Sequence, residues 1–289
     1  MSTAERFAGA TFGRVFDAQP SRDVVDLATL VAGLTRFQLK RKLARRIERE
    51  LATLERAFAS WKEGTPRTKK GLAYARMAKE EGDDAARSFH AAERARAKGA
   101  AKRDLRLWSP TLYRPAGRRT SSDVLALSCL VLDHDDGTSP EALSACWEGS
   151  LHVVHSTWSH TPERPKLRVC HPLARQVRAK DRRDVMDRGA ERAGDPADPA
   201  LKSPASPYAL PATPSPEAPR VAFVRSGALL DPVALGLARA ADSPPAAPEP
   251  PPISHFRPSQ DDAWIDVPVD APRVEAEGDE WANAFEDPF

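Results

Sequence analysis

LVLDHDDG (residues 130–137) and HVVHSTWSHTPERPKLRVCHPL (residues 152–173) are the two stretches that decide the fold. Their apolar runs are short and are typical of buried strands. The runs predict three strands, at residues 123–132, 151–156 and 167–169. Asp133, Asp135 and Asp136 follow the first apolar run, and His155, Ser159 and His160 follow the second. Groups that bind metals or phosphates thus stand at strand ends, which indicates a functional site and not an apolar core.

Helical periodicity precedes these strands. Apolar residues spaced three and four apart form one stripe: Leu39, Leu43, Ile47, Leu51, Leu54, Phe58 and Trp61. With charged residues on the opposite face, this spacing predicts a helix of about twenty residues, ended by Gly64-Thr65-Pro66. A second helix is predicted at residues 71–98, and the two form a helical arm. We favour a solvated charged face for this arm over a surface that binds nucleic acid.

Shorter elements complete the prediction. Helices are expected at residues 26–37, 139–147 and 181–193, with a weak one at 228–237, and short strands at 11–16, 208–211 and 221–225. Strands that alternate with helices indicate the mixed α/β class. A Pro-rich linker that includes PPAAPEPPP (residues 244–252) and an acidic tail are expected to be disordered.

The chain is therefore expected to have four segments. An opening strand and helix of a catalytic domain occupy residues 1–38, a helical arm is inserted at 39–100, the rest of the domain follows at 101–238, and the linker and tail occupy 239–289. Charge divides unevenly, because the last 29 residues hold ten acids and one base, a net charge of −9, in a chain of net charge +2. A basic body with an acidic tail fits a nucleic-acid partner, although a merely soluble, Arg-rich protein has the same composition.

The cysteines and the hydropathy of the chain indicate its cellular compartment. The three cysteines, Cys129, Cys146 and Cys170, have no CxxC spacing, which favours a reduced cytoplasmic setting over a zinc knuckle. The first residues lack the apolar core of a signal peptide, and no run of eighteen apolar residues occurs. We therefore expect no membrane span.

The acids and bases at the strand ends suggest phosphate chemistry. Asp133 and Asp135 lie two residues apart on a strand, so they face the same side. Their hard oxygens suit Mg²⁺ or Mn²⁺ and a polyphosphate substrate. His160 can donate to a phosphate oxygen, and Arg168 with Lys166 offers further contacts. Taken singly, these groups fit equally an acidic turn, a structural histidine and a surface salt bridge.

Together these residues carry a resemblance to a known family. DHDDG (residues 133–137), STWSHTP (156–162) and PKLRV (165–169) resemble motifs of the archaeo-eukaryotic primase superfamily. The most similar members are the primase-polymerases of bacterial plasmids, phages and other mobile elements. Residues 197–214 look like the family's third motif, and the resemblance extends over residues 107–237.

The resemblance implies a primase-polymerase-like fold whose catalytic sheet is like an RNA-recognition motif. It implies template-directed nucleotidyl transfer by two divalent metals, Mg²⁺ or Mn²⁺, on a single-stranded DNA template with nucleoside triphosphates. The implied catalytic residues are Asp133, Asp135 and His160. The implied metal ligands are Asp133, Asp135 and Asp198, and the implied nucleotide-binding residues are His160, Arg168, Lys166 and Ser159.

Departures from the family pattern leave other functions open. Ser206-Pro207 stand where many relatives have an arginine, and Ser159 directly precedes His160 where relatives place a serine two residues earlier. No GxxxxGK[ST] loop of a helicase ATPase is present. The alternatives are a catalytically inactive replication-initiation or DNA-binding protein of the same fold, and a metal-dependent nuclease that uses the same acids and His160.

The chain ends in DEWANAFEDPF (residues 279–289). This segment is similar to the acidic C-terminal peptide of bacterial single-stranded-DNA-binding proteins, which recruits replication partners. The resemblance implies that Trp281, Phe285, Pro288 and Phe289 dock a basic-rimmed hydrophobic pocket of a replication protein. An ordinary solubilising tail is the alternative.

Overall fold

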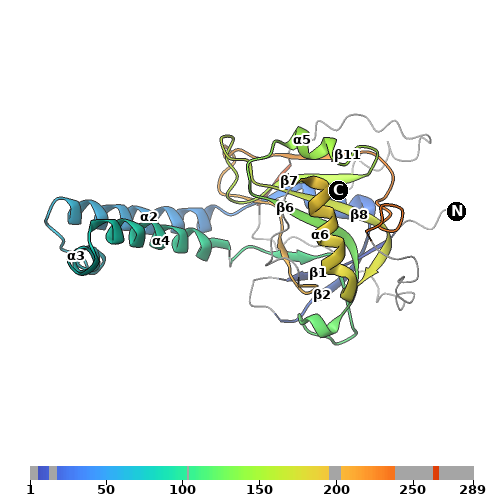
Figure 1. Cartoon of the computed structure of the whole chain (residues 1–289), viewed down its shortest axis with the longest axis horizontal. Helices are drawn as coiled ribbons and strands as arrows, with labels where there is room; N and C mark the ends of the chain where they lie inside the picture. Colours follow the sequence, from blue (N-terminus) through green and yellow to red (C-terminus); the bar gives the residue numbers. More distant parts are fainter. Residues whose placement is uncertain (1–5, 13–17, 103, 195–202, 238–262, 267–289) are drawn as a thin grey trace. The chain divides into compact units, whose positions relative to one another are not determined.

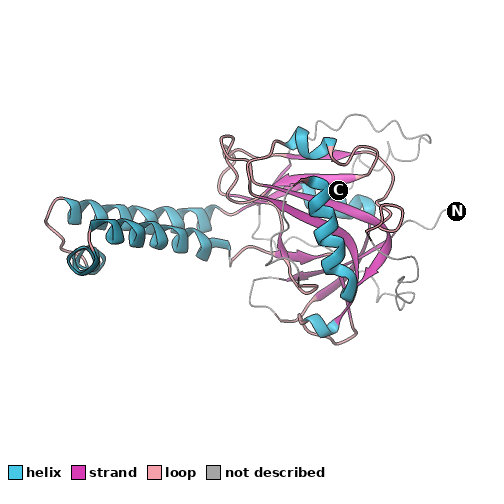
Figure 2. Cartoon of the chain, in the orientation of Figure 1, coloured by secondary structure: helices cyan, strands magenta, loops and turns pink. Residues whose placement is uncertain are grey.

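The computed structural model describes residues 6–12, 18–102, 104–194, 203–237 and 263–266. The chain divides into two compact units, one formed by residues 1–39 and 106–289 and the other by residues 40–105. The first unit combines strands with helices, and the second consists of helices (Figures 1 and 2). The expected mixed α/β class is confirmed. Within the described ranges, no helix has the length and apolar character needed to cross a membrane.

A five-stranded sheet organises the first unit. Its strands follow the order β11-β7-β8-β6-β5, and all neighbours are antiparallel. Their bounds are β5 Thr111–Tyr113, β6 Val124–His134, β7 His152–Ser156, β8 Leu167–Arg178 and β11 Ala222–Arg225. Strand β6 is almost continuously apolar from Val124 to Leu132, and the first seven residues of β8 are buried, because both faces of this sheet are covered.

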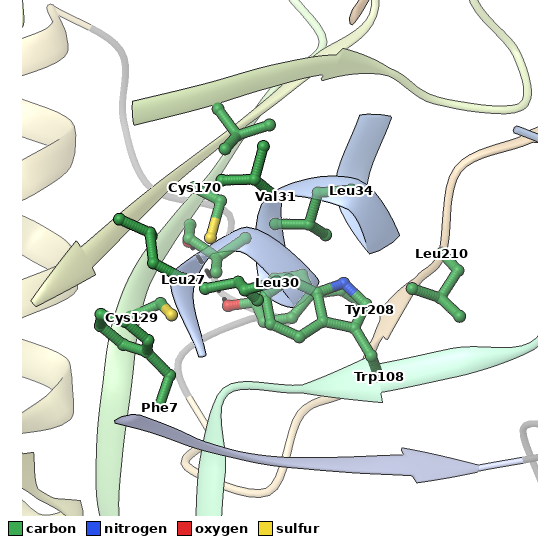
Figure 3. Close-up of a cluster of buried hydrophobic side chains, with 12 residues drawn as sticks. Phe7, Leu27, Leu30, Val31, Leu34, Trp108, Cys129, Cys170, Tyr208 and Leu210 are labelled. Carbon is green, nitrogen blue, oxygen red and sulfur yellow. Dashed lines mark hydrogen bonds between the residues drawn. The ribbon is translucent and has the colours of Figure 1, made fainter. Parts of the chain in front are cut away.

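One face of the sheet packs against α1 (Leu27–Thr35) and a second sheet. Val131 of β6 and Cys170 of β8 belong to one buried cluster with Leu30 of α1 and with Trp108 (Figure 3). The helix begins after Asp26, whose side chain accepts a hydrogen bond from the backbone N of Thr29 at 2.7 Å and so caps the first turn. Apolar burial on this face therefore reaches across elements that are far apart in the sequence.

The other face is covered by α5 (Pro140–Ala145) and α6 (Arg182–Ala193), and Figure 1 shows α6 lying across the strands. Leu130 of β6 packs with Val185 of α6 in one cluster. Leu143 of α5 packs with the sheet in another. Successive residues of β6 point to opposite faces, which is why Leu130 and Val131 enter different clusters.

Two smaller sheets complete the first unit. The four-stranded sheet has the order β2-β1-β4-β9, with β1 at Arg6–Phe12, β2 at Ser21–Asp26, β4 at Leu107–Ser109 and β9 at Tyr208–Ala209. The three-stranded sheet has the order β10-β3-β12, with β3 at Arg36–Leu39, β10 at Ala212–Thr213 and β12 at Ala263–Asp266. Strand β12 lies within the stretch expected to be linker and tail, so that expectation is wrong for these four residues.

The second unit contains α2 (Arg41–Lys62), α3 (Lys69–Glu81) and α4 (Asp83–Lys102). The single helix predicted at residues 71–98 is wrong, because Gly82 has a φ of 92° and separates α3 from α4. A left-handed φ of this kind is compatible with glycine and ends a helix. Tyr74 is fully buried at the centre of an aromatic cluster, and its hydroxyl forms a hydrogen bond of 3.1 Å with Nδ1 of His90.

Other predicted bounds also need correction. Residues 228–237 form isolated β-bridges at Ala228 and Leu230 followed by a turn, and not a helix, and the predicted strand at 167–169 continues to Arg178. Strand β1 begins at Arg6 and ends at Phe12, so most of the predicted strand at 11–16 lies outside the described residues. Short 3₁₀ helices occupy Ser121–Asp123 and Ala179–Asp181.

Gly227 provides a test of the close backbone packing beside β11. A Cβ placed there would lie 2.6 Å from the carbonyl oxygen of Gly149, a backbone atom that cannot swing aside. We expect Gly227→Ala to lower the free energy of unfolding by about 1–3 kcal/mol, the usual cost of overpacking. Gly9→Ala is the control, because its Cβ would meet only Ser109 O at 3.5 Å. Equal urea midpoints for the two variants would contradict this packing.

Candidate functional site

Strand pairing brings the predicted motifs to one edge of the five-stranded sheet. Because β6 and β8 are antiparallel, the end of β6 meets the beginning of β8, and Asp133 lies opposite Arg168. Strand β7 ends beside the same part of β8, with Ser156 opposite Leu167. The loop from Thr157 therefore returns to this edge. We call this end of the sheet, where β6 ends and β8 begins, the β6–β8 edge.

Asp133 and Arg168 form a two-bonded ion pair across the strands. Nε of Arg168 donates to Oδ1 of Asp133 at 2.5 Å, and Nη2 donates to Oδ2 at 2.9 Å. Nη1 donates to the carbonyl oxygen of Ala209 at 2.6 Å. The guanidinium also lies over the Tyr208 ring, 5.0 Å from its centroid. This paired, planar geometry is the strongest form of arginine–carboxylate contact.

Burial gives the pair its electrostatic character. Arg168 is only 7% exposed. Burial alone would raise the pKa of Asp133, but the adjacent Arg168 guanidinium outweighs it and holds that pKa below its ordinary value. Burial alone would lower the pKa of Arg168, but the Asp133 carboxylate outweighs it and raises that pKa. Each charge is therefore retained because the other is present.

Asp135 and Lys166 form a second, outer pair at the same edge. Nζ of Lys166 donates to Oδ2 of Asp135 at 2.9 Å, and the side chains of the lysine and the acid are 20% and 61% exposed. An exposed pair of this kind contributes little stability, about 0–1 kcal/mol. Lys166 can therefore exchange Asp135 for another anion at little cost in free energy.

His160 joins the outer pair through the backbone. The N–H of Lys166 donates to Nδ1 of His160 at 3.2 Å. Burial lowers the pKa of His160, which favours the neutral ring. Because Nδ1 accepts the hydrogen bond from Lys166, the neutral ring carries its proton on Nε2. His160 can therefore donate one hydrogen bond from Nε2 to a ligand beside Lys166.

His155 is a buried neighbour that belongs to the polar groups predicted at the strand ends, but the family resemblance gave it no role. It lies opposite Arg168 on β8 and is fully buried. Its Nδ1 donates to the carbonyl oxygen of Ser156 at 3.1 Å. Burial, followed by the charge of Arg168, lowers the pKa of His155 to about 3. The sequence signal was its place at the end of the apolar run of β7.

Tyr208 and Arg182 are two further residues that the sequence motifs did not place in the site. Nη2 of Arg182 donates to the Tyr208 hydroxyl at 2.7 Å, and that hydroxyl donates to the carbonyl oxygen of Val131 at 3.4 Å. These bonds fix the Tyr208 ring, over which the Arg168 guanidinium lies. The signals for Tyr208 were the short strand expected at residues 208–211 and its place in residues 197–214, which look like the family's third motif.

Of the remaining predicted site residues, the structure describes only Ser159. Ser159 is exposed in the loop between β7 and β8. Asp198, proposed as the third metal ligand, lies outside the described residues. The tail residues also lie outside them: Trp281, Phe285, Pro288 and Phe289.

Two of the three predicted metal ligands, Asp133 and Asp135, lie within the described residues, and both are paired with cationic side chains. Both oxygens of Asp133 accept hydrogen bonds from Arg168, and Oδ2 of Asp135 accepts one from Lys166. The described part of the chain contains no group of three or more His, Cys, Asp or Glu side chains able to hold a metal ion. In this geometry the two acids serve as partners of cationic side chains.

Comparison with known proteins gives one family match and one structural similarity. Residues 112–197 match the family model of the VapE N-terminal domain. The primase-polymerase AEP domain of cyanophage S-2L is similar in structure, with 17% sequence identity, a TM-score of 0.33, and coverage of 45% of this chain and 68% of that chain. No curated protein matches. The family match spans β6, β7 and β8, so the motif-based resemblance has independent support over this segment.

The buried His155 makes stability depend on pH. The unfolded chain binds a proton at this residue near pH 6.5, whereas the folded chain does so only at about pH 3. Stability is therefore lost as pH falls from 6.5 towards 3, by about 1.6 kcal/mol between pH 6.5 and 5. In His155→Gln, the fall in unfolding free energy over that interval should be smaller by this amount. Urea titrations at both pH values measure it, and parallel falls in the two proteins would refute it.

Proposed function

We propose that this chain acts in the replication of a mobile element as a primase-polymerase-type protein that binds a nucleoside triphosphate at the β6–β8 edge. The observation that carries the proposal is the convergence of Lys166, His160 and the Asp133–Arg168 pair at that edge. The VapE N-terminal match over residues 112–197 supports a replication role. The motif resemblance supports the nucleotide as ligand.

The triphosphate contacts are assigned to the outer part of the edge. Lys166 presents an ammonium held only by the exposed Asp135, and a polyphosphate with several negative charges competes well with a single carboxylate. His160 adds a neutral donor beside it. Arg168 uses three of its N–H groups on Asp133 and Ala209. We therefore assign Arg168 the role of positioning Asp133, in place of direct triphosphate contact.

The finer proposal is template-directed nucleotidyl transfer on a single-stranded DNA template. It needs Mg²⁺ or Mn²⁺ held by Asp133, Asp135 and Asp198. The first two acids are paired with Arg168 and Lys166, and Asp198 lies outside the described residues. Metal binding must therefore be measured separately from triphosphate binding. The acidic tail is proposed, as a further part of this function, to dock a replication protein.

One observation favours a second candidate, a catalytically inactive protein of the same fold. Arg168 occupies both carboxylate oxygens of Asp133, and such a buried pair is costly to break. A protein that keeps this pair would bind nucleotides or DNA without transferring a nucleotidyl group.

Triphosphate binding by the full chain tests the proposed ligand. Lys166→Gln should raise the Kd for a fluorescent nucleoside triphosphate about tenfold, the effect of removing one charged hydrogen bond of about 1.4 kcal/mol. Arg175→Gln is the matched control, because it removes one exposed, ion-paired cation from the other end of β8. Equal Kd values for Lys166→Gln and Arg175→Gln would overturn the site.

Primer synthesis on single-stranded template with Mg²⁺ or Mn²⁺ then separates the two candidates. Incorporation by the wild type that disappears in Asp133→Ala/Asp135→Ala and in His160→Ala supports nucleotidyl transfer. A wild type that binds triphosphate but incorporates none excludes the enzyme and establishes the inactive candidate. Removal of Phe289 should leave synthesis intact and weaken only partner binding.

A further inference from the structure

The helical unit holds much of the positive charge of this chain. Residues 40–105 contain nineteen Lys and Arg against ten Asp and Glu, a net charge of +9, whereas the whole chain carries +2. Helix α2 concentrates this charge on one side (Figure 1 shows its place in the unit). A strongly basic surface attracts polyanions through release of their counterions.

Four exposed arginines of α2 form a line, which we call the arginine stripe: Arg41, Arg45, Arg49 and Arg56. At 3.6 residues per turn they fall within an arc of about 80° and extend over about 22 Å of helix. The buried residues of α2 occupy the opposite side: Leu43, Ala44, Ile47, Leu54 and Ala57. The stripe therefore faces away from the core of its own unit.

Described acids do not neutralise the stripe, whereas they pair with several other cations of the unit. Nη2 of Arg46 bonds Asp104 at 2.5 Å, and Nη1 of Arg94 bonds Glu55 at 3.0 Å. Among the described residues, by contrast, no acid forms an ion pair with any arginine of the stripe, and even the neighbouring Glu48 forms none. Like charges four residues apart disfavour a helix, so this arrangement does not serve the stability of α2.

We propose that the arginine stripe binds the phosphodiester backbone of a nucleic acid. Guanidinium groups match phosphate geometry with paired hydrogen bonds. A line of about 22 Å extends along roughly six nucleotides of one strand at about 3.4 Å each. The apolar side of α2 is buried within the unit, so the helix has no free apolar face with which to enter a membrane surface. A long, regular polyanion is the partner that this surface fits.

The stripe lies on a different unit from the β6–β8 edge and does not depend on catalysis or on triphosphate binding. Its failure would leave the proposed function untouched, and the reverse also holds. The stripe would hold nucleic acid through its backbone, without reading sequence.

A pair of charge-matched variants of the full chain tests the proposal. The stripe variant is Arg41→Gln/Arg45→Gln/Arg49→Gln/Arg56→Gln. The control variant removes four exposed cations elsewhere in the unit that form no ion pair with a described acid: Arg67→Gln/Arg76→Gln/Lys79→Gln/Lys98→Gln. Circular dichroism confirms that both variants keep their helices. Fluorescence anisotropy then measures binding to a labelled 30-nucleotide single strand (about five times the length that the stripe spans) and to the corresponding duplex at several salt concentrations.

We expect the stripe variant to bind at least about tenfold more weakly and the control variant to stay within about twofold of wild type. The slope of log K against log salt should fall in magnitude by about 0.7 for each phosphate that the stripe variant no longer neutralises on the single strand, or about 0.9 on the duplex. The strand form whose binding weakens more identifies the ligand. Equal weakening in the two variants, or equal competition by poly-glutamate and by unlabelled DNA, would overturn the proposal.

Discussion

The buried guanidinium of Arg168 is the constraint on which the site depends. A charge in this position is tolerated only when it is paired and hydrogen-bonded, and Asp133 accepts two bonds while Ala209 accepts a third. Because these partners lie on β6 and β9, the arginine fixes the ends of three strands relative to one another. Tyr208 covers one face of the guanidinium. The inner pair therefore gives the edge its fixed geometry.

The outer groups at this edge have the opposite character. Asp135 and Lys166 are partly exposed, and the neutral His160 is oriented by a backbone N–H. This arrangement is suited to anion binding. An anion would displace the weak Asp135–Lys166 pair and leave the buried Asp133–Arg168 pair intact. In this geometry both oxygens of Asp133 accept hydrogen bonds from Arg168, whereas the proposed nucleotidyl transfer requires Asp133 to bind a metal ion. The arginine stripe of α2 adds a separate cationic surface, for which we propose a nucleic-acid backbone as the partner, bound without reading its sequence.

Sequence patterns predicted the elements whose periodicity is strong. The apolar stripe from Leu39 to Trp61 corresponds to α2, and the apolar runs before Asp133 and up to His155 correspond to β6 and β7. Strands as short as β4 and β9 carry no periodicity of their own, and their pairing depends on partners about a hundred residues away. This is why β4 was missed and β9 was predicted only as part of a longer strand.

Three other features could not be predicted from local sequence patterns, because they depend on backbone conformation or on strand register. The break at Gly82 depends on a left-handed φ, which an Ala-rich and charge-rich helical pattern does not reveal. The pairing of Arg168 with Asp133 depends on strand register, so the motifs suggested a phosphate contact and a metal ligand where the fold places a buried ion pair. His155 was recognised as a polar group at a strand end, but its depressed pKa follows from burial beside Arg168, which depends on strand register.

A double-mutant cycle between Asp133 and Arg168 tests this central constraint most directly. Arg168→Met alone should lower the free energy of unfolding by about 3–5 kcal/mol, because it leaves Asp133 without its partner in a buried position. Asp133→Leu/Arg168→Met should recover most of that decrease, giving a coupling energy of about 2 kcal/mol or more. Additive effects of the two single changes would contradict this constraint, since they would mean that the two charges do not depend on each other.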